Sequence, residues 1–400
     1  MPLPNVNIDF TNGALGSVAP NADGVVGLAI TGVPVEDKFL LNHRYILRSM
    51  AGLAALGITA EADDDNAFAY KTVREFYDQA GEGAELHLMA FANTLKPSQI
   101  LDKNTNNAKA LLQGANGSIR CLCVAFQPAE GYVPTITNGL DSDMAAAMLN
   151  GQALAEWATN TMFAPLFVIL EGRAFTNANV ANLSDLSEYK YNRVAVLIGD
   201  TVSSSTGAAV GLLAGRIAQT AVQTHIGRVR DGALGAPNIF IEDLEPNAAD
   251  ITTIHDKGFI TFRQLVGLAG FYFSDDNLAT AIADDFRSIA RRRTIDKAYR
   301  IAHHNMLQNV NDNLPISSTG GISAIIAKNW ENEVIQAVAT QMAGELGADP
   351  DDPTDRGVRA FVDPNQNVVA TGMITVILQV KPFGYAKFIT VELGFYINQN

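Results

Sequence analysis

The two ends of the chain alternate between apolar and polar positions, which is the period of a β-strand with one buried face. Near the N-terminus the apolar positions are Val6, Ile8 and Phe10, and near the C-terminus an alternating run covers residues 384–397. An uncovered strand edge offers unpaired N–H and C=O groups to another chain. The pattern therefore predicts either two arms that exchange strands with copies of the same protein, or strands that pair within the chain's own sheet.

Between residues 21 and 250, short apolar runs alternate with helical segments. The predicted strands cover 25–30, 85–91, 118–126, 164–171 and 193–198, and the predicted helices cover 39–56, 64–80, 96–114, 142–161 and 206–224. Strands that alternate with helices of this length are typical of βαβ units on a largely parallel sheet. We therefore expect an α/β region in the middle of the chain.

The pattern changes near residue 251. The elements predicted beyond it are a strand-like stretch at 259–273, helices at 280–311 and 322–345, a loop at 347–356, and strands at 357–362, 368–380 and 384–397. Helices followed by a meander of strands indicate an α+β arrangement. The chain is thus predicted to consist of an N-terminal arm (1–20), an α/β region (21–250), an α+β region (251–383) and a C-terminal arm (384–400).

Composition narrows the class of protein. The chain has 400 residues, 48% of them hydrophobic, and a net charge of −14. This acidic balance opposes sequence-independent binding to nucleic acids and to anionic membranes, which requires clustered Lys and Arg. The apolar runs are shorter than the ~20 residues of a membrane helix, and residues 1–10 lack the features of a signal peptide. We therefore expect a protein that is made and folds in the cytoplasm.

One loop has the residues of an anion site. A predicted strand at 193–198 is followed by a hydroxyl-rich loop at 201–207 and then by a helix, and helix N-termini bind phosphate groups. The loop lacks every phosphate-binding or nucleophile motif that would make it specific. Ser and Thr also cap helices routinely, and the spacing of Gly207, Gly211 and Gly215 suits close helix packing. An α/β enzyme that binds a phosphorylated small molecule at 201–207 remains the alternative function.

The other candidates for metal or catalytic chemistry are weaker. The acidic loop of Asp349, Asp351, Asp352 and Asp355 lacks the Gly and Glu of a calcium-binding loop, so we interpret it as a stiff connector. Cys121 and Cys123 lie on one face of a predicted strand, as small core residues. The six histidines show no metal-binding or catalytic spacing: His43, His87, His225, His255, His303 and His304. We predict no catalytic residue, no metal and no cofactor.

A basic segment stands out in this acidic chain. Its members are Arg287, Arg291, Arg292, Arg293, Lys297 and Arg300. Such a stripe on a helix is most often a solvated face. In a polymer it could instead meet the acidic surface of a neighbouring subunit and determine its orientation.

The C-terminal part resembles a known family in the order of its elements and in short stretches of its sequence. The residues that show this are RRRTIDKAYRIAHHNMLQNVNDNLP (291–315), the helix through Trp330, VDPNQNVVATGMITVILQVKP (362–382) and GYAKFITVELGFYI (384–397). They look like the contractile tail sheath family of phage contractile tails, R-type bacteriocins and related injection systems. The resemblance covers about 259–397, and GRVRDGAL (227–234) fits it more weakly.

The resemblance implies a fold and a set of contacts. The α+β region would be an inner assembly domain near a tube, the α/β region would lie outward, and the arms would add strands to neighbouring subunits. The inter-subunit arm residues would be Val6, Ile8, Phe10, Phe388, Thr390, Glu392, Leu393, Phe395 and Ile397. The candidate tube-facing or inter-subunit charges are Lys328, Glu331, Glu333, Arg291 and Arg292.

The predicted function is therefore structural and not enzymatic. The family implies a sheath subunit that polymerises helically around an inner tube and contracts to drive it through a target envelope. Its partners would be other copies of itself, the inner tube protein, and baseplate and tail terminator proteins, without nucleic acid, membrane or cofactor. It would assemble in the bacterial cytoplasm and end in a virion tail or a released particle. A closed-ring oligomer is a further alternative.

Overall fold

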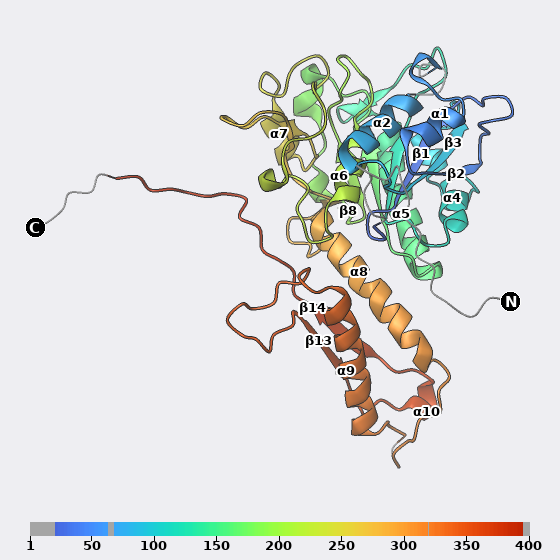
Figure 1. Ribbon diagram of the computed structural model, residues 1–400, viewed down its shortest axis with the longest axis vertical. Coiled ribbons are helices and arrows are strands. Elements are labelled where there is room, and N and C mark those ends of the chain that lie inside the picture. The colour runs from blue at the N-terminus through green and yellow to red at the C-terminus, as the bar shows by residue number, and fades with distance from the viewer. Residues whose placement is uncertain (1–20, 63–67, 319, 395–400) are drawn as a thin grey trace, which may run out of the picture. The chain divides into compact units, whose positions relative to one another are not determined.

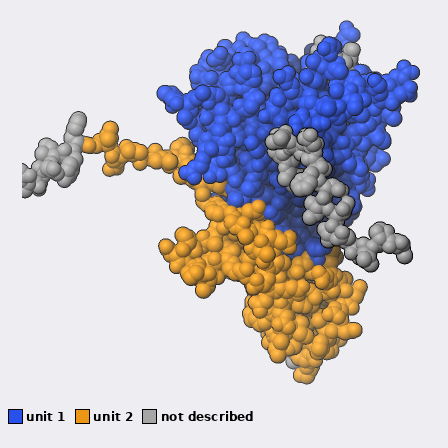
Figure 2. Space-filling model, in the orientation of Figure 1, with its two compact units in different colours: residues 1–304 blue, residues 305–400 orange. Residues whose placement is uncertain are grey.

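The computed structural model describes residues 21–62, 68–318 and 320–394 (Figure 1). The chain forms two compact units, residues 1–304 and residues 305–400 (Figure 2). Helix α8 (Ile289–Met306) begins in the first unit and ends in the second. Among the residues that the structure describes, no helix is long and apolar enough to span a membrane.

The first unit is built on a six-stranded sheet. Its strands, in spatial order, are β2 (Arg44–Leu47), β3 (Leu86–Ala92), β1 (Val26–Gly32), β4 (Cys121–Ala125), β7 (Phe167–Glu171) and β9 (Val194–Leu197). Strand β2 runs antiparallel to β3, and the other neighbouring strands are parallel. The predicted parallel α/β sheet is confirmed. Cys121 and Cys123 are free thiols inside its core, as predicted.

Helices connect these strands. They are α1 (Met50–Ala55), α2 (Ala69–Ala80), α3 (Pro97–Ile100), α4 (Ala108–Gly114), α5 (Asp143–Thr161), α6 (Val210–Gln219) and α7 (Ile251–Asp256). The helix predicted at 39–56 is wrong in its first half, which contains β2. The helix predicted at 96–114 is interrupted, because Asp102 accepts the backbone N–H of Asn104 in a turn, where such side chains compete with the helical hydrogen bonds.

The remaining elements of the unit are short. The strands pair as β5 (Ile136–Thr137) with β6 (Leu140–Asp141), β8 (Lys190–Tyr191) with β12 (Ala279–Thr280), and β10 (Phe262–Arg263) with β11 (Tyr272–Phe273). The 3-10 helices are η1 (Ala60–Ala62), η2 (Asn177–Asn182), η3 (Leu186–Glu188) and η4 (Val229–Asp231).

The first unit extends well past residue 251. Ile260 forms a parallel bridge with Leu197, and its N–H donates to the carbonyl of Val196 at 3.0 Å. The segment therefore continues the sheet beyond β9. The compact units divide between His304 and Asn305, not near residue 251 as the sequence pattern suggested. The helix predicted at 280–311 is shorter, since α8 starts at Ile289.

The second unit is small. It contains η5 (Leu307–Asn309), α9 (Ala324–Gln341), β13 (Val358–Val362), α10 (Val368–Thr371) and β14 (Val376–Val380). The predicted helix at 322–345 and strand at 357–362 are confirmed, whereas the strand predicted at 368–380 begins as α10. Val362 packs with Ile322 and Ala327 in a core of its own.

Helices α2 and α6 pack closely because glycines lie between them. A Cβ atom at Gly211 would be 2.1 Å from the carbonyl oxygen of Thr72, and one at Gly215 would be 2.6 Å from that of Phe76. Both obstacles are backbone atoms in a helix, so they cannot move aside. The predicted packing role of these two glycines agrees with this geometry, while Gly207 lies elsewhere, beside Glu171.

We expect Gly211→Ala to lower the free energy of unfolding by about 2 kcal/mol, because overpacking forces two helix backbones apart. Gly52→Ala in α1 is the matched control. Its Cβ would meet nothing nearer than 3.5 Å, so the change should stay within about 1 kcal/mol of the wild type. Urea unfolding followed by circular dichroism measures both. Equal stability of the two variants would contradict the packing role.

Candidate assembly surface and carboxyl-edge pocket

The described part of the C-terminal arm leaves its apolar side chains in solvent. Residues 381–394 form neither helix nor strand. Phe388 is 90% exposed and Leu393 is 96% exposed, with Ile389 and Val391 exposed between them. The strand predicted at 384–397 is therefore absent over 384–394, and pairing within the chain's own sheet is not found there. Thr390 and Glu392 are exposed as well. Val6, Ile8, Phe10, Phe395 and Ile397 lie outside the described residues.

The small sheet of the second unit has one covered face and one open face. Val358, Ala360 and Val362 alternate in β13 with the exposed residues Arg359 and Phe361. On the open face, Phe361 lies opposite Ile377 and Arg359 lies opposite Gln379, to which it donates a hydrogen bond of 2.8 Å. A sheet of two strands has an edge on each side. This unit thus combines an open sheet with a segment whose apolar side chains are exposed.

The charged residues predicted as contacts on α9 differ in their exposure to solvent. Glu331 is buried and accepts the N–H of Val362 at 2.9 Å, so it joins α9 to β13. Lys328 pairs with Glu331 at 2.5 Å but is largely exposed. Glu333 is half-buried and accepts a hydrogen bond from Asn305. Lys328 is the most accessible of the three for a contact with another protein.

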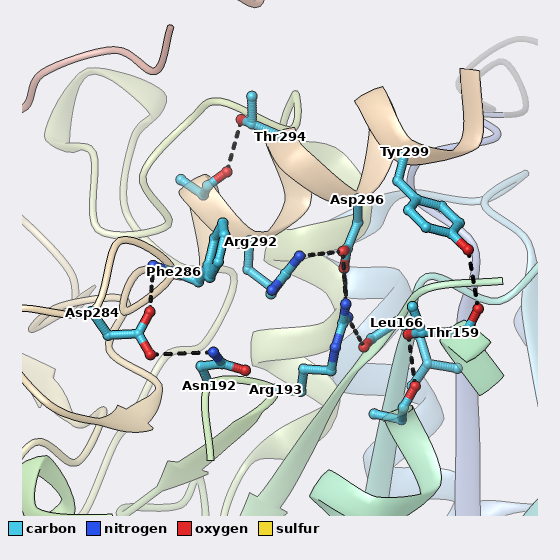
Figure 3. A network of polar contacts seen from close by, with 12 residues as sticks. Thr159, Leu166, Asn192, Arg193, Asp284, Phe286, Arg292, Thr294, Asp296 and Tyr299 are labelled. Atoms are coloured by element: carbon cyan, nitrogen blue, oxygen red, sulfur yellow. Dashed lines mark hydrogen bonds and ion pairs between the residues drawn. The ribbon is translucent and has the colours of Figure 1, made fainter. Parts of the chain in front are cut away.

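The basic segment on α8 is mostly an internal feature (Figure 3). Arg292 and Arg193 both contact the buried carboxylate of Asp296, at 2.7 Å and 3.0 Å respectively. Arg292 also lies over the ring of Phe286. The interpretation of Arg292 as a solvated or inter-subunit charge is wrong, because its guanidinium is already paired inside the first unit. Arg291 is half-buried.

Three more cations of α8 bind the chain near the start of β1 and the end of α6. Arg293 donates to the carbonyls of Ile217 and Thr220 at 2.9 Å, which satisfies the free carbonyls at the end of α6. Lys297 and Arg300 pair with Asp23 at 2.7 Å and 2.6 Å. Burial opposes ionisation of Asp23, but these two cations hold its pKa below the usual value. The segment therefore anchors α8 to the first unit.

A pocket of about 260 Å³ lies at the carboxyl edge of the parallel sheet. Its lining comes from the ends of β4, β7 and β9, the start of α2 and the loop before α6: Phe68, Lys71, Thr72, Ala125, Phe126, Gln127, Glu171, Arg173, Asp200, Val202, Ser203, Ser204, Ser205, Thr206 and Gly207. Successive strands are added first on one side of β1 (β3) and then on the other (β4, β7 and β9), so the topological switch point lies between β1 and β4. Open α/β sheets bind ligands at the carboxyl edge near such a point.

Charged side chains form two connected groups at this pocket. Lys71 pairs with Asp200 at 2.5 Å and with Glu75 at 3.0 Å, and the hydroxyl of Thr201 donates to Glu75. Burial raises the pKa of Glu75 to about 7, although Lys71 opposes the shift. Arg173 lies 3.6 Å from Glu171 and donates to Thr206 at 3.1 Å. Burial also raises the pKa of Glu171.

The loop at 201–207 does not form an anion-binding site. The carboxylate of Glu171 accepts the N–H of Phe126 at 2.9 Å and lies 3.5 Å from the N–H of Ala208. A Cβ at Gly207 would be 2.9 Å from the same carboxylate. The chain's own anion thus occupies the place in which a phosphate would approach the helix. This geometry argues against the phosphorylated ligand considered from the sequence.

The sequence indicated the part of the pocket lining in the loop at 201–207, whereas Glu171 and Arg173 were overlooked although they left a signal. Glu171 and Asp200 each lie at the carboxyl end of a predicted strand, and Arg173 follows two residues later. Parallel strands bring their carboxyl ends to one edge of the sheet. A charged residue directly after a buried strand is therefore the sign that could have located the pocket.

A third polar cluster joins His225 to Asp275 and Asp276, at 2.9 Å and 3.2 Å from Nε2. It is the one group of this kind with metal-binding spacing within the described ranges. The N–H of Gly227 donates to Nδ1, which leaves the ring proton on Nε2, facing the carboxylates. Asp276 in turn accepts the N–H of Ala290 at the start of α8, so the cluster connects His225 to this helix.

The acidic loop near residue 350 is also held by hydrogen bonds between its own residues. Asp355 accepts the N–H groups of Asp349 and Gly357 at 2.9 Å and 2.8 Å. These hydrogen bonds, with Lys381 nearby, lower the pKa of Asp355 to about 2. The loop has the geometry of the predicted connector.

Comparison with solved structures defines the class of fold. A chain of the cryo-EM structure of the anti-feeding prophage (AFP) baseplate, 6-fold symmetrised, has a TM-score of 0.64 at 14% identity, over 99% of this chain and 100% of that chain. A chain of an extracellular contractile injection system, the PVC sheath complex in the contracted state, has a TM-score of 0.58 at 13% identity, over 98% of both chains. The AFP baseplate in the contracted state gives 0.57 at 13% identity, again over 98% of both.

The fold is therefore one that occurs in contractile injection systems, which confirms the predicted sheath-like resemblance and extends it over the whole chain. The chain belongs to the DUF2586 family. Residues 3–277 match its N-terminal domain and residues 285–400 match its C-terminal domain. No curated protein matches in sequence.

We expect Asp296→Asn to lower the free energy of unfolding by about 3 kcal/mol or more, because two buried guanidinium groups lose their counter-charge. Asp285→Asn, on an exposed position just before α8, makes the same change of charge and should stay within about 0.5 kcal/mol of the wild type. Chemical denaturation at neutral pH measures both. A small effect of Asp296→Asn would show that water replaces the lost carboxylate as the partner of the Arg193 and Arg292 guanidinium groups.

Proposed function

We propose that this protein is a structural subunit of a contractile sheath, which polymerises around an inner tube. The observation that carries the proposal is the exposed, alternating apolar segment that ends the described chain. A monomer gains nothing from holding Phe388 and Leu393 in water, since burying such a side chain is worth about 1.5–3 kcal/mol. A polymer recovers this free energy at every subunit contact.

The second unit offers a suitable receiver for the segment. Strands β13 and β14 form an antiparallel pair, and isolated two-stranded sheets are marginally stable in water. A strand from a neighbouring copy would extend this sheet through backbone hydrogen bonds and place alternate side chains beside Phe361 and Ile377. Residues 1–20 are proposed to act as the corresponding arm at the other end of the chain.

The proposed role is mechanical and needs no bound nucleotide. A sheath subunit stores free energy as surface that is exposed in the extended polymer and buried after contraction. Each additional 100 Å² of apolar burial supplies about 2.5 kcal/mol, and a sheath repeats the gain over many subunits. The likeness to chains of AFP and PVC particles over nearly the full length supports this reading. Inner tube, baseplate and tail terminator proteins are the proposed partners, with Lys328 as a candidate contact.

We expect the triple variant Ile389→Thr, Val391→Thr and Leu393→Thr to remain folded but to lose polymerisation. Thr keeps the β-propensity of the segment and removes apolar surface at the three alternating positions within the described residues. Negative-stain microscopy over a concentration series, with sedimentation velocity, measures assembly. A melting temperature equal to that of the wild type would show that the monomer is intact.

The matched control changes the other face of the same segment, with Thr390→Ser and Glu392→Gln. Assembly should survive these two changes. Wild-type protein that forms hollow striated tubes supports the sheath. Tubes formed equally well by the triple variant would refute the arm, and compact particles of fixed size that persist in the presence of the inner tube protein would refute the sheath.

A further inference from the structure

We propose that the carboxyl-edge pocket binds a small aliphatic amine through its positively charged ammonium group. All the residues that line this pocket belong to the first unit. The inference therefore does not depend on the sheath function.

The charges around the pocket are unbalanced. Glu171 and Asp200 line the pocket with Lys71 and Arg173, and a third carboxylate, Glu75, lies behind Lys71, 3.0 Å from its Nζ, without lining the pocket. All of these side chains except Lys71 are at least nine-tenths buried. The excess of one carboxylate is consistent with the raised pKa values of Glu75 and Glu171. Oε2 of Glu75 is buried without a hydrogen-bond partner. An added cation would complete the neutralisation, which is worth more in a buried site than in water.

Two carboxylate oxygens at the pocket are open acceptors. Oδ1 of Asp200 receives Lys71 and the N–H of Thr201, and the contacts described for this side chain leave Oδ2 for a ligand. Oε1 of Glu171 has only a long contact, 3.5 Å, to the N–H of Ala208. An ammonium group carries three donors and no acceptor, and so it matches these oxygens.

The pocket also has apolar walls that fit a hydrocarbon chain. Phe68, Ala125 and Phe126 line it together with Val202, which is half exposed at its opening. Ligand sites commonly combine such walls with a few converging polar groups. A phosphate would meet the carboxylate of Glu171 at the start of α6, and Arg173 is already bound by Phe126 and Thr206. The chemistry therefore favours a primary amine on an aliphatic chain.

The test uses the full-length protein, isothermal titration calorimetry and thermal unfolding at constant ionic strength. The probes are 1,4-butanediamine, 1,4-butanediol as its neutral analogue, inorganic phosphate, and Nα-acetyl-lysine N-methylamide as a mimic of a lysine on another protein. We expect the diamine to bind and to raise the melting temperature with concentration, because it binds the native state. The diol and phosphate should do neither. Tighter binding of the lysine mimic would identify a protein side chain as the source of the ammonium group.

Two variants connect binding to this pocket. Glu171→Gln keeps an acceptor for Phe126 and should weaken diamine binding by about tenfold or more, the effect of losing a charged hydrogen bond. Val202→Trp fills the opening without changing a charge and should abolish binding. Asp256→Asn, an exposed site in α7, is the control for charge and should bind like the wild type.

Three results would overturn the proposal: no diamine binding with a dissociation constant below about 10 mM, equal binding by Val202→Trp, or binding of phosphate. If Glu171→Gln fails to fold, the Val202→Trp result decides.

Discussion

One buried carboxylate connects α8 to the sheet of the first unit through ion pairs on both sides. Asp296 contacts two guanidinium groups, from Arg193 at the start of β9 and from Arg292 on its own helix, and all three side chains are buried. Taking three charges out of water is costly, and only good geometry offsets it. The hydrogen bond from Arg193 to the carbonyl of Leu166, at 2.8 Å, extends the contact to the segment that leads into β7. The helix that continues into the second unit is thus fixed to the sheet by specific ion pairs as well as by apolar packing.

Buried charges are stabilised in different ways at the two edges of the sheet. At the amino edge, the cations of α8 meet Asp296, Asp23 and the free carbonyls of α6, and the ion pairs are short. At the carboxyl edge, two carboxylates and two cations line an open pocket, and a third carboxylate, Glu75, lies behind Lys71. The first arrangement is what a structural clamp requires, because each charged group meets an opposite charge or a carbonyl oxygen within the chain. The second leaves polar capacity unused, which is a property of binding sites more than of framework.

The core strands could be predicted from the sequence, whereas the long-range ion pairs could not. Strands β1, β3, β4, β7 and β9 are buried on both faces, so each is a nearly continuous apolar run. Strand β2 was missed because it is a mixed edge strand with Ile46 exposed. Local pattern shows that Asp296 follows Arg292 by four residues, but Arg193 lies 103 residues away in sequence. Charged side chains are also expected outside, and so Arg292 was placed on the surface. Local pattern marks Glu171 and Asp200 at the ends of strands, but only the sheet order shows that they line one pocket.

The anchoring of Asp23 has a mechanical consequence. Residues 1–20 join the described chain two residues before Asp23, whose carboxylate binds Lys297 and Arg300 and whose carbonyl oxygen faces Arg293. Tension applied to the N-terminal end would therefore not act first on β1, which starts at Val26. It would load the ion pairs to α8, and through them a helix whose last residues belong to the other unit. A pull at one end of the chain would thus reach the helix that links its two units through one aspartate and two cations.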